Sequence, residues 1–167
     1  MFDSAMRWTA SPTGRAVLAI FLLALALRLL TVAVIHPSPR DGRFDDSVWY
    51  DTSARHLAAG NGYVFDPTVW FASDGSPIYP GEEELSPTAI WPPGYPATLA
   101  VLYKASGDSL WAGRMFNVLC GALTAVLVYA IARKLFGHLE GVFAGVLMAL
   151  FPGHVYFTPI LMSETYF

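Results

Sequence analysis

The chain has 167 residues, of which 54% are hydrophobic and only 14% are charged. A soluble domain carries about 25% charged residues, so this composition indicates a membrane protein. The net charge of −3 is unevenly distributed, because ten of the thirteen Asp and Glu residues fall between His36 and Leu110. The sequence has no basic patch suited to nucleic acid, which excludes nucleic acid as a partner.

The first apolar segment covers residues 16–35, AVLAIFLLALALRLLTVAVI, and has about the twenty residues that cross the hydrocarbon of a bilayer. We expect it to be the first transmembrane span. A cleaved signal peptide is the alternative, because Arg7 and Arg15 precede the apolar run and residues 24–26 have the small-x-small form of a cleavage site. The run continues to Ile35 and further apolar segments follow, which favours a retained span.

Two further apolar segments, residues 111–132 and 139–157, predict a second and a third span. Between them, residues 133–138 (RKLFGH) leave room only for a tight turn between antiparallel helices. The cations of this turn and of residues 1–15 place both segments on the cytoplasmic side by the positive-inside rule.

The acidic segment, residues 36–110, and the tail, residues 158–167, are then both expected on the extracytoplasmic side. With its N-terminus in the cytoplasm, the protein is expected to be integral to a plasma membrane. Both carboxylate-rich parts of the chain would therefore share one compartment.

The sequence after the first span predicts a short amphipathic helix. Tyr50, Ala54 and Leu57 recur at helical spacing, and Gly60 with its neighbours is a C-terminal stop. The expected N-cap is one of Asp45, Asp46 or Ser47. Asp51 lies about one and a half turns further on and is expected to be a solvated helix residue.

Residues 66–87 are rich in Gly, Pro, Asp and Ser, which predicts an irregular surface loop. The prolines of WPPGYP bar a helix until Pro96, which can occupy a first helical turn. Residues 97–104 then predict another helix, which ends near Gly107. We expect these helices to lie on the outer membrane face, with Trp and Tyr side chains at headgroup level.

Three carboxylates are the candidates for chemistry: Asp45, Asp46 and Glu164. A carboxylate held at a helix N-terminus stays ionised and oriented, and it can act as a general base toward an acceptor hydroxyl. The alternative is structural, with one aspartate capping its helix and Ser163–Glu164 starting another. Both roles are compatible at one residue. Two acids on one side also suit binding of a cation.

Arg28 and Arg114 lie toward the outer ends of two predicted spans. Their side chains are expected either to snorkel to the interface or to bind a lipid phosphate, because arginine forms bidentate bonds with phosphate oxygens. The four histidines are divided between the two sides of the membrane, so a histidine metal site is not expected.

The order of the motifs resembles the N-terminal part of the GT-C superfamily of integral-membrane glycosyltransferases. The resemblance extends from Ala16 to Glu164. The chain is similar to bacterial protein mannosyltransferases and aminoarabinose–lipid A transferases, which implies a place in the bacterial inner membrane. After the first span, the motifs that carry it are DDSVWYDTSARHLAAGNGYVF, SPTAIWPPGYPATLAVLYKASG, AGRMFNVLCGALTAVLVYAIARKLFG and LMSE.

The resemblance implies that Asp45, with Asp46 as the close alternative, is the base that activates the acceptor. It also implies that Glu164 belongs to a second acidic motif and that the donor is a sugar on polyprenyl or dolichyl phosphate. Aminoarabinose transferases tend to carry a lysine before the proline pair, where this chain has Trp91. Contact with the lipid phosphate is then left to Arg114, Arg28 or residues outside this chain.

We therefore expect an all-α membrane protein with three transmembrane helices and short extracytoplasmic juxtamembrane helices, as a fragment of a larger multi-span bundle. Its expected function is transfer of a sugar from a polyprenyl-phosphate donor to a protein, lipid or glycan acceptor on the extracytoplasmic face. No cofactor is expected to be required, a divalent cation stays an alternative, and the fragment alone is expected to be inactive. The competing hypothesis is a non-catalytic three-span subunit whose acidic loop binds a partner or cations.

Overall fold

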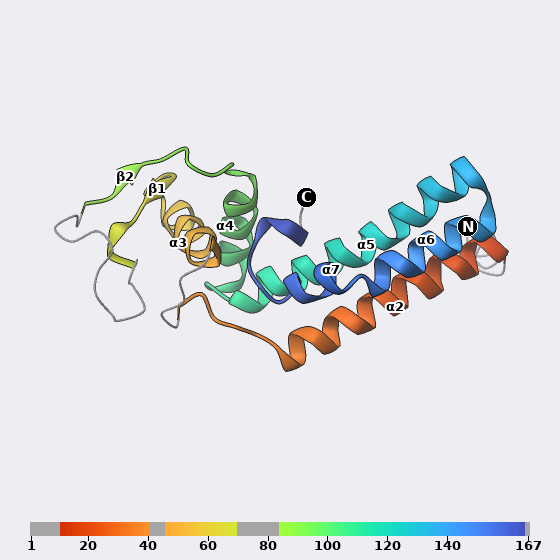
Figure 1. Cartoon of the computed structure of the whole chain (residues 1–167). Helices are drawn as coiled ribbons and strands as arrows, with labels where there is room; N and C mark the ends of the chain where they lie inside the picture. Colours follow the sequence, from red (N-terminus) through yellow and green to blue (C-terminus); the bar gives the residue numbers. More distant parts are fainter. Residues whose placement is uncertain (1–10, 41–45, 70–83, 166–167) are drawn as a thin grey trace. The chain divides into compact units, whose positions relative to one another are not determined.

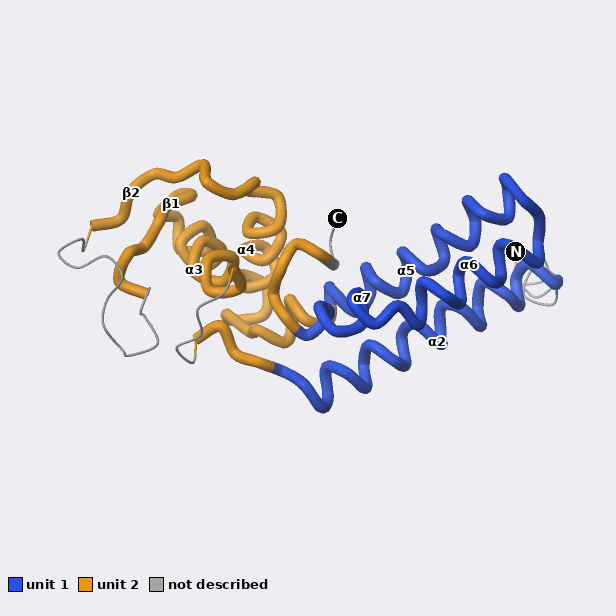
Figure 2. The backbone as a smooth tube through the Cα atoms, viewed as in Figure 1, with its two compact units in different colours: residues 1–36, 116–159 blue, residues 37–115, 160–167 orange. Residues whose placement is uncertain are grey.

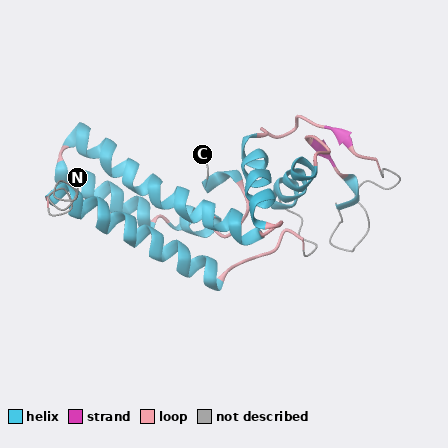
Figure 3. Ribbon diagram, turned by 180° about the vertical axis from the view of Figure 1, so that it is seen from behind, coloured by secondary structure: helices cyan, strands magenta, loops and turns pink. Residues whose placement is uncertain are grey.

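The computed structural model describes residues 11–40, 46–69 and 84–165, and nearly all of their regular structure is helical (Figures 1 and 3). This confirms the prediction of a mainly helical chain. Two of the helices are long and apolar enough to cross a membrane, and a third apolar helix is shorter.

The chain divides into two compact units, which Figure 2 distinguishes by colour. Unit 1 comprises residues 1–36 and 116–159, and unit 2 comprises residues 37–115 and 160–167. Helix α5, Leu110–Phe136, contributes its first residues to unit 2 and the rest to unit 1.

Unit 1 contains helix α2, Pro12–Val34, which together with α5 makes the two candidate membrane spans. The start of α2 follows from its sequence. Ser11 Oγ accepts a hydrogen bond of 3.0 Å from the Gly14 amide, and Pro12 takes the first helical position, where a missing N–H costs nothing. The helix therefore begins about one turn before the predicted boundary at residue 16.

The turn between α5 and α6, His138–Leu150, is shorter than the predicted residues 133–138. Helix α5 continues through Phe136, so only Gly137 separates the two helices. Gly137 has a φ of 127°, a conformation that glycine adopts without steric cost. Arg133 and Lys134 consequently lie in the last turn of α5, where cations stabilise a helix C-terminus.

The third apolar segment, predicted as one span over residues 139–157, is two helices. Helix α6 ends at Leu150 and helix α7, Pro152–Phe157, follows. Pro152 has no amide hydrogen, and Phe151 before it is extended, with φ −60° and ψ 114°. The 13 residues of α6 span about 20 Å, less than the roughly 30 Å of bilayer hydrocarbon.

Small residues line the contacts within unit 1. Helix α6 buries Gly141, Gly145 and Ala149, which recur every fourth residue on one face. A Cβ added at Gly145 would lie 2.8 Å from Ile20 Cδ1 of α2 and 2.9 Å from Tyr129 Cβ of α5. The missing side chain lets three helices approach closely, which is the packing that stabilises helices in a membrane.

Unit 2 is built on helices α3, Asp46–Ala59, and α4, Gly94–Ser106, which pack against each other. Four short elements complete it: the antiparallel strands β1, Val64–Phe65, and β2, Ser86–Pro87, and the 3-10 helices η1, Pro67–Val69, and η2, Ser163–Thr165. The predicted surface loop is therefore bounded by a small sheet.

The apolar face predicted for α3 forms the core of unit 2. Tyr50 and Ala54 are buried, and Leu57 packs against the same cluster. Helix α4 contributes Tyr95 and Leu99, both 0% exposed. The helical spacing in the sequence thus identified the side of α3 that packs against α4.

Both helices of unit 2 end at the predicted glycines. Gly60 has a φ of 87° and Gly107 a φ of 72°, the left-handed region in which glycine ends a helix. Helix α4 begins at Gly94, before the predicted residue 97, because Pro96 falls within the first turn and no helical hydrogen bond is lost there.

Asp51 is buried, so the prediction that it would be solvated is wrong. Its carboxylate accepts hydrogen bonds of 2.9 Å from both Nε and Nη2 of Arg40, and the Tyr103 hydroxyl donates a third at 2.7 Å. Residues 47–54 are all buried. Helix α3 therefore has no solvated face over this stretch, and a polar side chain there needs protein partners.

Candidate functional site

Two of the three candidate acids belong to unit 2. Asp46 is the first residue of α3 and is half-buried, and Glu164 is an exposed residue of η2. Asp45 lies outside the described residues. Because α3 and η2 come from distant parts of the sequence, the fold of unit 2 is what assembles this pair.

Tyr50 lies within the electrostatic reach of both acids. Burial raises the pKa of its hydroxyl, a hydrogen bond with Ser163 lowers it, and the negative charges of Glu164 and Asp46 raise it further. The hydroxyl oxygens of Tyr50 and Ser163 are 2.9 Å apart. Because Asp46 precedes Tyr50 by about one turn of α3 and Glu164 follows Ser163, this hydrogen bond joins the two acid-bearing segments of unit 2.

Aromatic side chains surround the Tyr50 ring. Tyr95 meets it edge to face, with ring centroids 5.2 Å apart, and Trp91 lies tilted at 6.4 Å. Trp91 is 37% exposed, and its carbonyl oxygen accepts a hydrogen bond of 2.8 Å from the Tyr63 hydroxyl. Trp91, at the position where aminoarabinose transferases tend to carry a lysine, thus adds an aromatic ring beside Tyr50.

Arg28 is fully buried in unit 1 and does not extend to the surface. Its Nη1 donates to the carbonyl oxygens of Ala24 at 3.2 Å and Ala149 at 3.3 Å. Ala149 lies in the last turn of α6, where carbonyl groups lack helical partners, so Arg28 caps the end of the broken helix. A Cβ at Gly121 would collide with the Arg28 side chain. Its Nε and Nη2 have no hydrogen-bond partner among the described residues.

Arg114 is also buried, but in unit 2. Its Nη2 donates to the Pro37 carbonyl oxygen at 2.8 Å, and its guanidinium carbon lies 5.3 Å from the centre of the Trp111 ring. These contacts tie the start of α5 to the segment that follows the first span. The two arginines proposed as phosphate ligands therefore belong to different units.

Asn117, in the AGRMFNVLCGALTAVLVYAIARKLFG motif, has a structural contact in unit 1. Its Nδ2 donates to the Thr158 carbonyl oxygen at 3.3 Å, and Thr158 Oγ1 donates to the His154 carbonyl oxygen at 2.8 Å. This motif residue thus holds the residue that follows α7 against α5.

Sequence reasoning missed a charged network in unit 2. Arg40 bridges Asp51 and Asp108, and Asp108 also pairs with Arg55 at 3.4 Å. The hydrogen bonds that Arg40 donates to Asp51 raise the pKa of the Arg40 guanidinium. Burial, and to a smaller extent the charge of Asp51, raises the pKa of the Tyr103 hydroxyl. These residues follow no helical or strand period, so no local pattern in the sequence indicated the pairing.

The chemistry available at the acid pair is proton transfer. Within the part of the chain that the structure describes, no three His, Cys, Asp or Glu side chains are grouped so as to hold a metal ion. Asp46 and Glu164 are two carboxylates beside a polar hydroxyl pair, an arrangement that can orient an incoming hydroxyl and accept its proton.

Comparison with known proteins gives one match. Residues 91–166 match the model of the dolichyl-phosphate-mannose-protein mannosyltransferase family, a range that contains α4, most of the apolar helices and Glu164 but neither Asp46 nor Arg28. No curated protein and no solved structure matches the chain significantly. Over the matched residues, the chain resembles GT-C glycosyltransferases at the level of the protein mannosyltransferase family.

Proposed function

We propose that this chain is the N-terminal part of a GT-C glycosyltransferase that moves a sugar from a polyprenyl-phosphate-linked donor to an acceptor hydroxyl on the extracytoplasmic face of the membrane. The observation that carries the proposal is the 2.9 Å hydrogen bond between the hydroxyls of Tyr50 and Ser163, which joins the segment that bears Asp46 to the segment that bears Glu164 within unit 2. The family match over residues 91–166 supports it independently, because it includes Glu164 and η2.

The proposed reaction is an inverting single displacement. Asp46, or Asp45 beside it in the sequence, accepts the proton of the acceptor hydroxyl as its oxygen bonds to the anomeric carbon of the sugar. The bond between that carbon and the lipid phosphate breaks, and the phosphate leaves as an anion. Glu164 orients the acceptor from the opposite element, η2.

The leaving phosphate needs positive charge, and Arg114, which belongs to unit 2 together with the candidate acids, is the proposed source. Arginine donors aimed at a developing anion stabilise the transition state. Arg114 has a hydrogen bond to the Pro37 carbonyl oxygen and a contact with the Trp111 ring in unit 2. To bind the leaving phosphate, its guanidinium must exchange these contacts for bonds to phosphate oxygens.

The test is transfer of mannose from polyprenyl-phosphate mannose by the complete protein in liposomes. Asp46→Asn and Asp45→Asn should each be made, together with the double variant. Loss of a general base should lower the rate by about 100-fold or more in at least one single variant. Glu84→Gln is the matched control, because Glu84 is an exposed carboxylate of the same acidic segment, and its rate should stay within about twofold.

Unchanged transfer in the Asp45/Asp46 double variant would reject the assignment of the base. Failure of the wild-type protein to transfer sugar from any polyprenyl-phosphate donor would instead favour the non-catalytic subunit, whose acidic loop would then be tested for calcium binding by titration calorimetry.

A further inference from the structure

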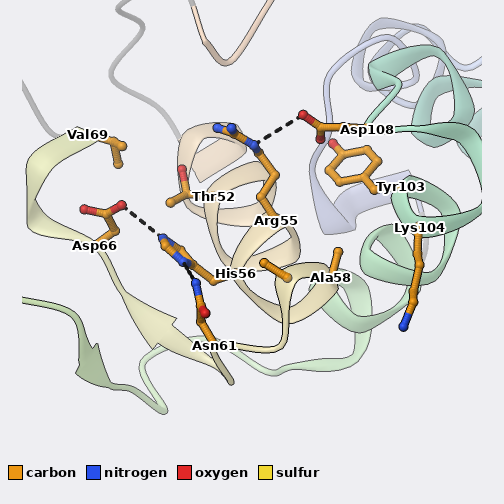
Figure 4. A pocket seen from close by; sticks show the side chains of 11 residues that line it. Thr52, Arg55, His56, Ala58, Asn61, Asp66, Val69, Tyr103, Lys104 and Asp108 are labelled. Carbon is orange, nitrogen blue, oxygen red and sulfur yellow. Dashed lines mark hydrogen bonds and ion pairs between the residues drawn. The ribbon is translucent and has the colours of Figure 1, made fainter.

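A polar pocket of about 440 Å³ lies in unit 2, beside α3 (Figure 4). Its volume falls in the range of small-molecule sites, about 300–1,000 Å³. Six polar side chains that line it supply hydrogen-bonding groups: Arg55, His56, Asn61, Asp66, Lys104 and Asp108. None of them takes part in the acid pair of the proposed catalytic site.

The pocket lies on the far side of α3 from Asp46 and Tyr50. Arg55 lies nine positions after Asp46, and Ala59 lies nine positions after Tyr50. That spacing is about two and a half helical turns, which places the members of each pair on opposite faces. A molecule in this pocket is therefore held apart from the hydroxyl activated at Asp46.

The side chains at one end of the pocket are fixed before any ligand binds. Figure 4 shows His56 between Asp66 and Asn61, with Nε2 3.0 Å from Asp66 Oδ2 and Nδ1 3.1 Å from Asn61 Nδ2. Asp66 also accepts from the Thr68 hydroxyl at 2.6 Å. Since a carboxylate accepts, Nε2 of His56 donates to it and Nδ1 accepts from Asn61. The amide oxygen of Asn61 is thereby left as a hydrogen-bond acceptor.

The charges around the pocket balance. Arg55 and Lys104 carry positive charge, and Asp66 and Asp108 carry negative charge. Arg55 Nε is held by Asp108 Oδ2, so the two terminal guanidinium nitrogens are the donors that remain. A balanced set of charges favours an uncharged ligand that both donates and accepts hydrogen bonds, because an ion would meet a side chain of its own sign.

The wall of the pocket also includes apolar surface, from Ala58, Ala59 and Val69. A sugar ring matches this mixture, because its hydroxyl groups both donate and accept while its C–H face is apolar. Planar amide and guanidinium groups suit paired hydrogen bonds to neighbouring hydroxyls.

We propose that this pocket is a carbohydrate-binding subsite, separate from the reacting groups, that holds a neutral sugar unit by Arg55 and Asn61. The choice of a sugar over a polar peptide rests on the proposed glycosyltransferase function. The pocket would anchor a part of a glycan ligand remote from the bond that is formed.

The test is binding of methyl α-D-mannopyranoside to the complete protein in nanodiscs, by saturation-transfer NMR and titration calorimetry. Arg55→Gln and Asn61→Ala should each raise the Kd by at least tenfold. Ala59→Trp should block the pocket by bulk while leaving the polar groups in place, which keeps the test decisive if a polar variant fails to fold. Arg15→Gln on α2 is the charge-matched control and should bind as the wild type does.

Binding of the mannoside that is unaffected by Arg55→Gln, Asn61→Ala and Ala59→Trp would overturn the proposal, as would absence of binding to the wild type. Tighter competition by inorganic phosphate or by a Ser/Thr-rich tripeptide than by the sugar would overturn it as well. The Asp45/Asp46 double variant should retain mannoside binding while losing transfer. An active Asp45/Asp46 double variant with pocket-dependent mannoside binding would reject the catalytic assignment alone.

Discussion

Asp51 shows how one charged residue can hold unit 2 together. Its carboxylate has three donors, two from Arg40 and one from Tyr103, and its side chain is only 3% exposed. Removing one partner of such a pair leaves the other uncompensated and partly desolvated. The residue therefore contributes to the stability of unit 2 rather than to chemistry at its surface.

At this scale we predict that Asp51→Asn lowers the free energy of unfolding by about 3 kcal/mol. Thermal unfolding of the detergent-solubilised protein would measure the loss. Asp108→Asn is the control, because Asp108 also pairs with Arg40 but its side chain is 44% exposed, and exposed pairs contribute about 1 kcal/mol or less. Equal losses in the two variants would show that burial does not set the value of the Asp51 contacts.

Among the elements, α6 and α7 depart furthest from the predicted architecture. The proline at the start of α7 ends α6 within the apolar segment, and Arg28 donates to a carbonyl oxygen in the last turn of α6. Broken helices within membranes require other groups to satisfy the freed backbone, and a buried arginine meets that need. The segment is therefore two helices divided at Pro152, with Arg28 as the partner of a carbonyl group at the end of the first.

At the same scale, the buried glycines of α6, Gly141 and Gly145, predict that larger side chains will not fit at these positions. Gly145→Leu should destabilise unit 1 by about 1–3 kcal/mol, because the added side chain would overlap Ile20 and Tyr129. Ala130→Leu adds similar bulk on the exposed face of α5 and should leave stability unchanged. Thermal unfolding, with yield in the membrane fraction, would compare them. A stable Gly145→Leu protein would mean that α6 does not pack closely against α2 and α5.

For the whole molecule, the proposed site requires a particular membrane topology. Asp46 and Glu164 both belong to unit 2, whereas the α5–α6 turn belongs to unit 1. The proposal places unit 2 outside the cytoplasm and this turn inside it, as the positive-inside rule predicts from Arg133 and Lys134.

Thiol labelling of intact cells would check this topology. Cys120, the one cysteine of the chain, is first replaced by Ser. In that background Arg55→Cys and Glu164→Cys should react with a membrane-impermeant maleimide, because both positions are exposed in unit 2. Lys134→Cys should react only after the membrane is permeabilised. Arg55 reports on α3, the helix that begins at Asp46. Labelling of Arg55→Cys and Glu164→Cys from opposite sides of the membrane would therefore exclude a site shared by Asp46 and Glu164.

Several features could be read directly from the sequence. The positions of α2 and α5, the buried face of α3 and the glycines that end α3 and α4 all depend on residues within one or two turns of each other. Helical period, capping and the requirements of proline and glycine act over that distance. The candidate acids were identified by the same means, from their place beside predicted helices.

Only the tertiary structure decided the rest. The burial of Asp51, the capping of α6 by Arg28 and the hydrogen bond that joins the segments of Asp46 and Glu164 each involve residues far apart in the chain. Whether a polar side chain meets water, a partner charge or a helix end depends on which segments pack against it. That packing is a property of the folded chain, and no periodic pattern along the sequence encodes it.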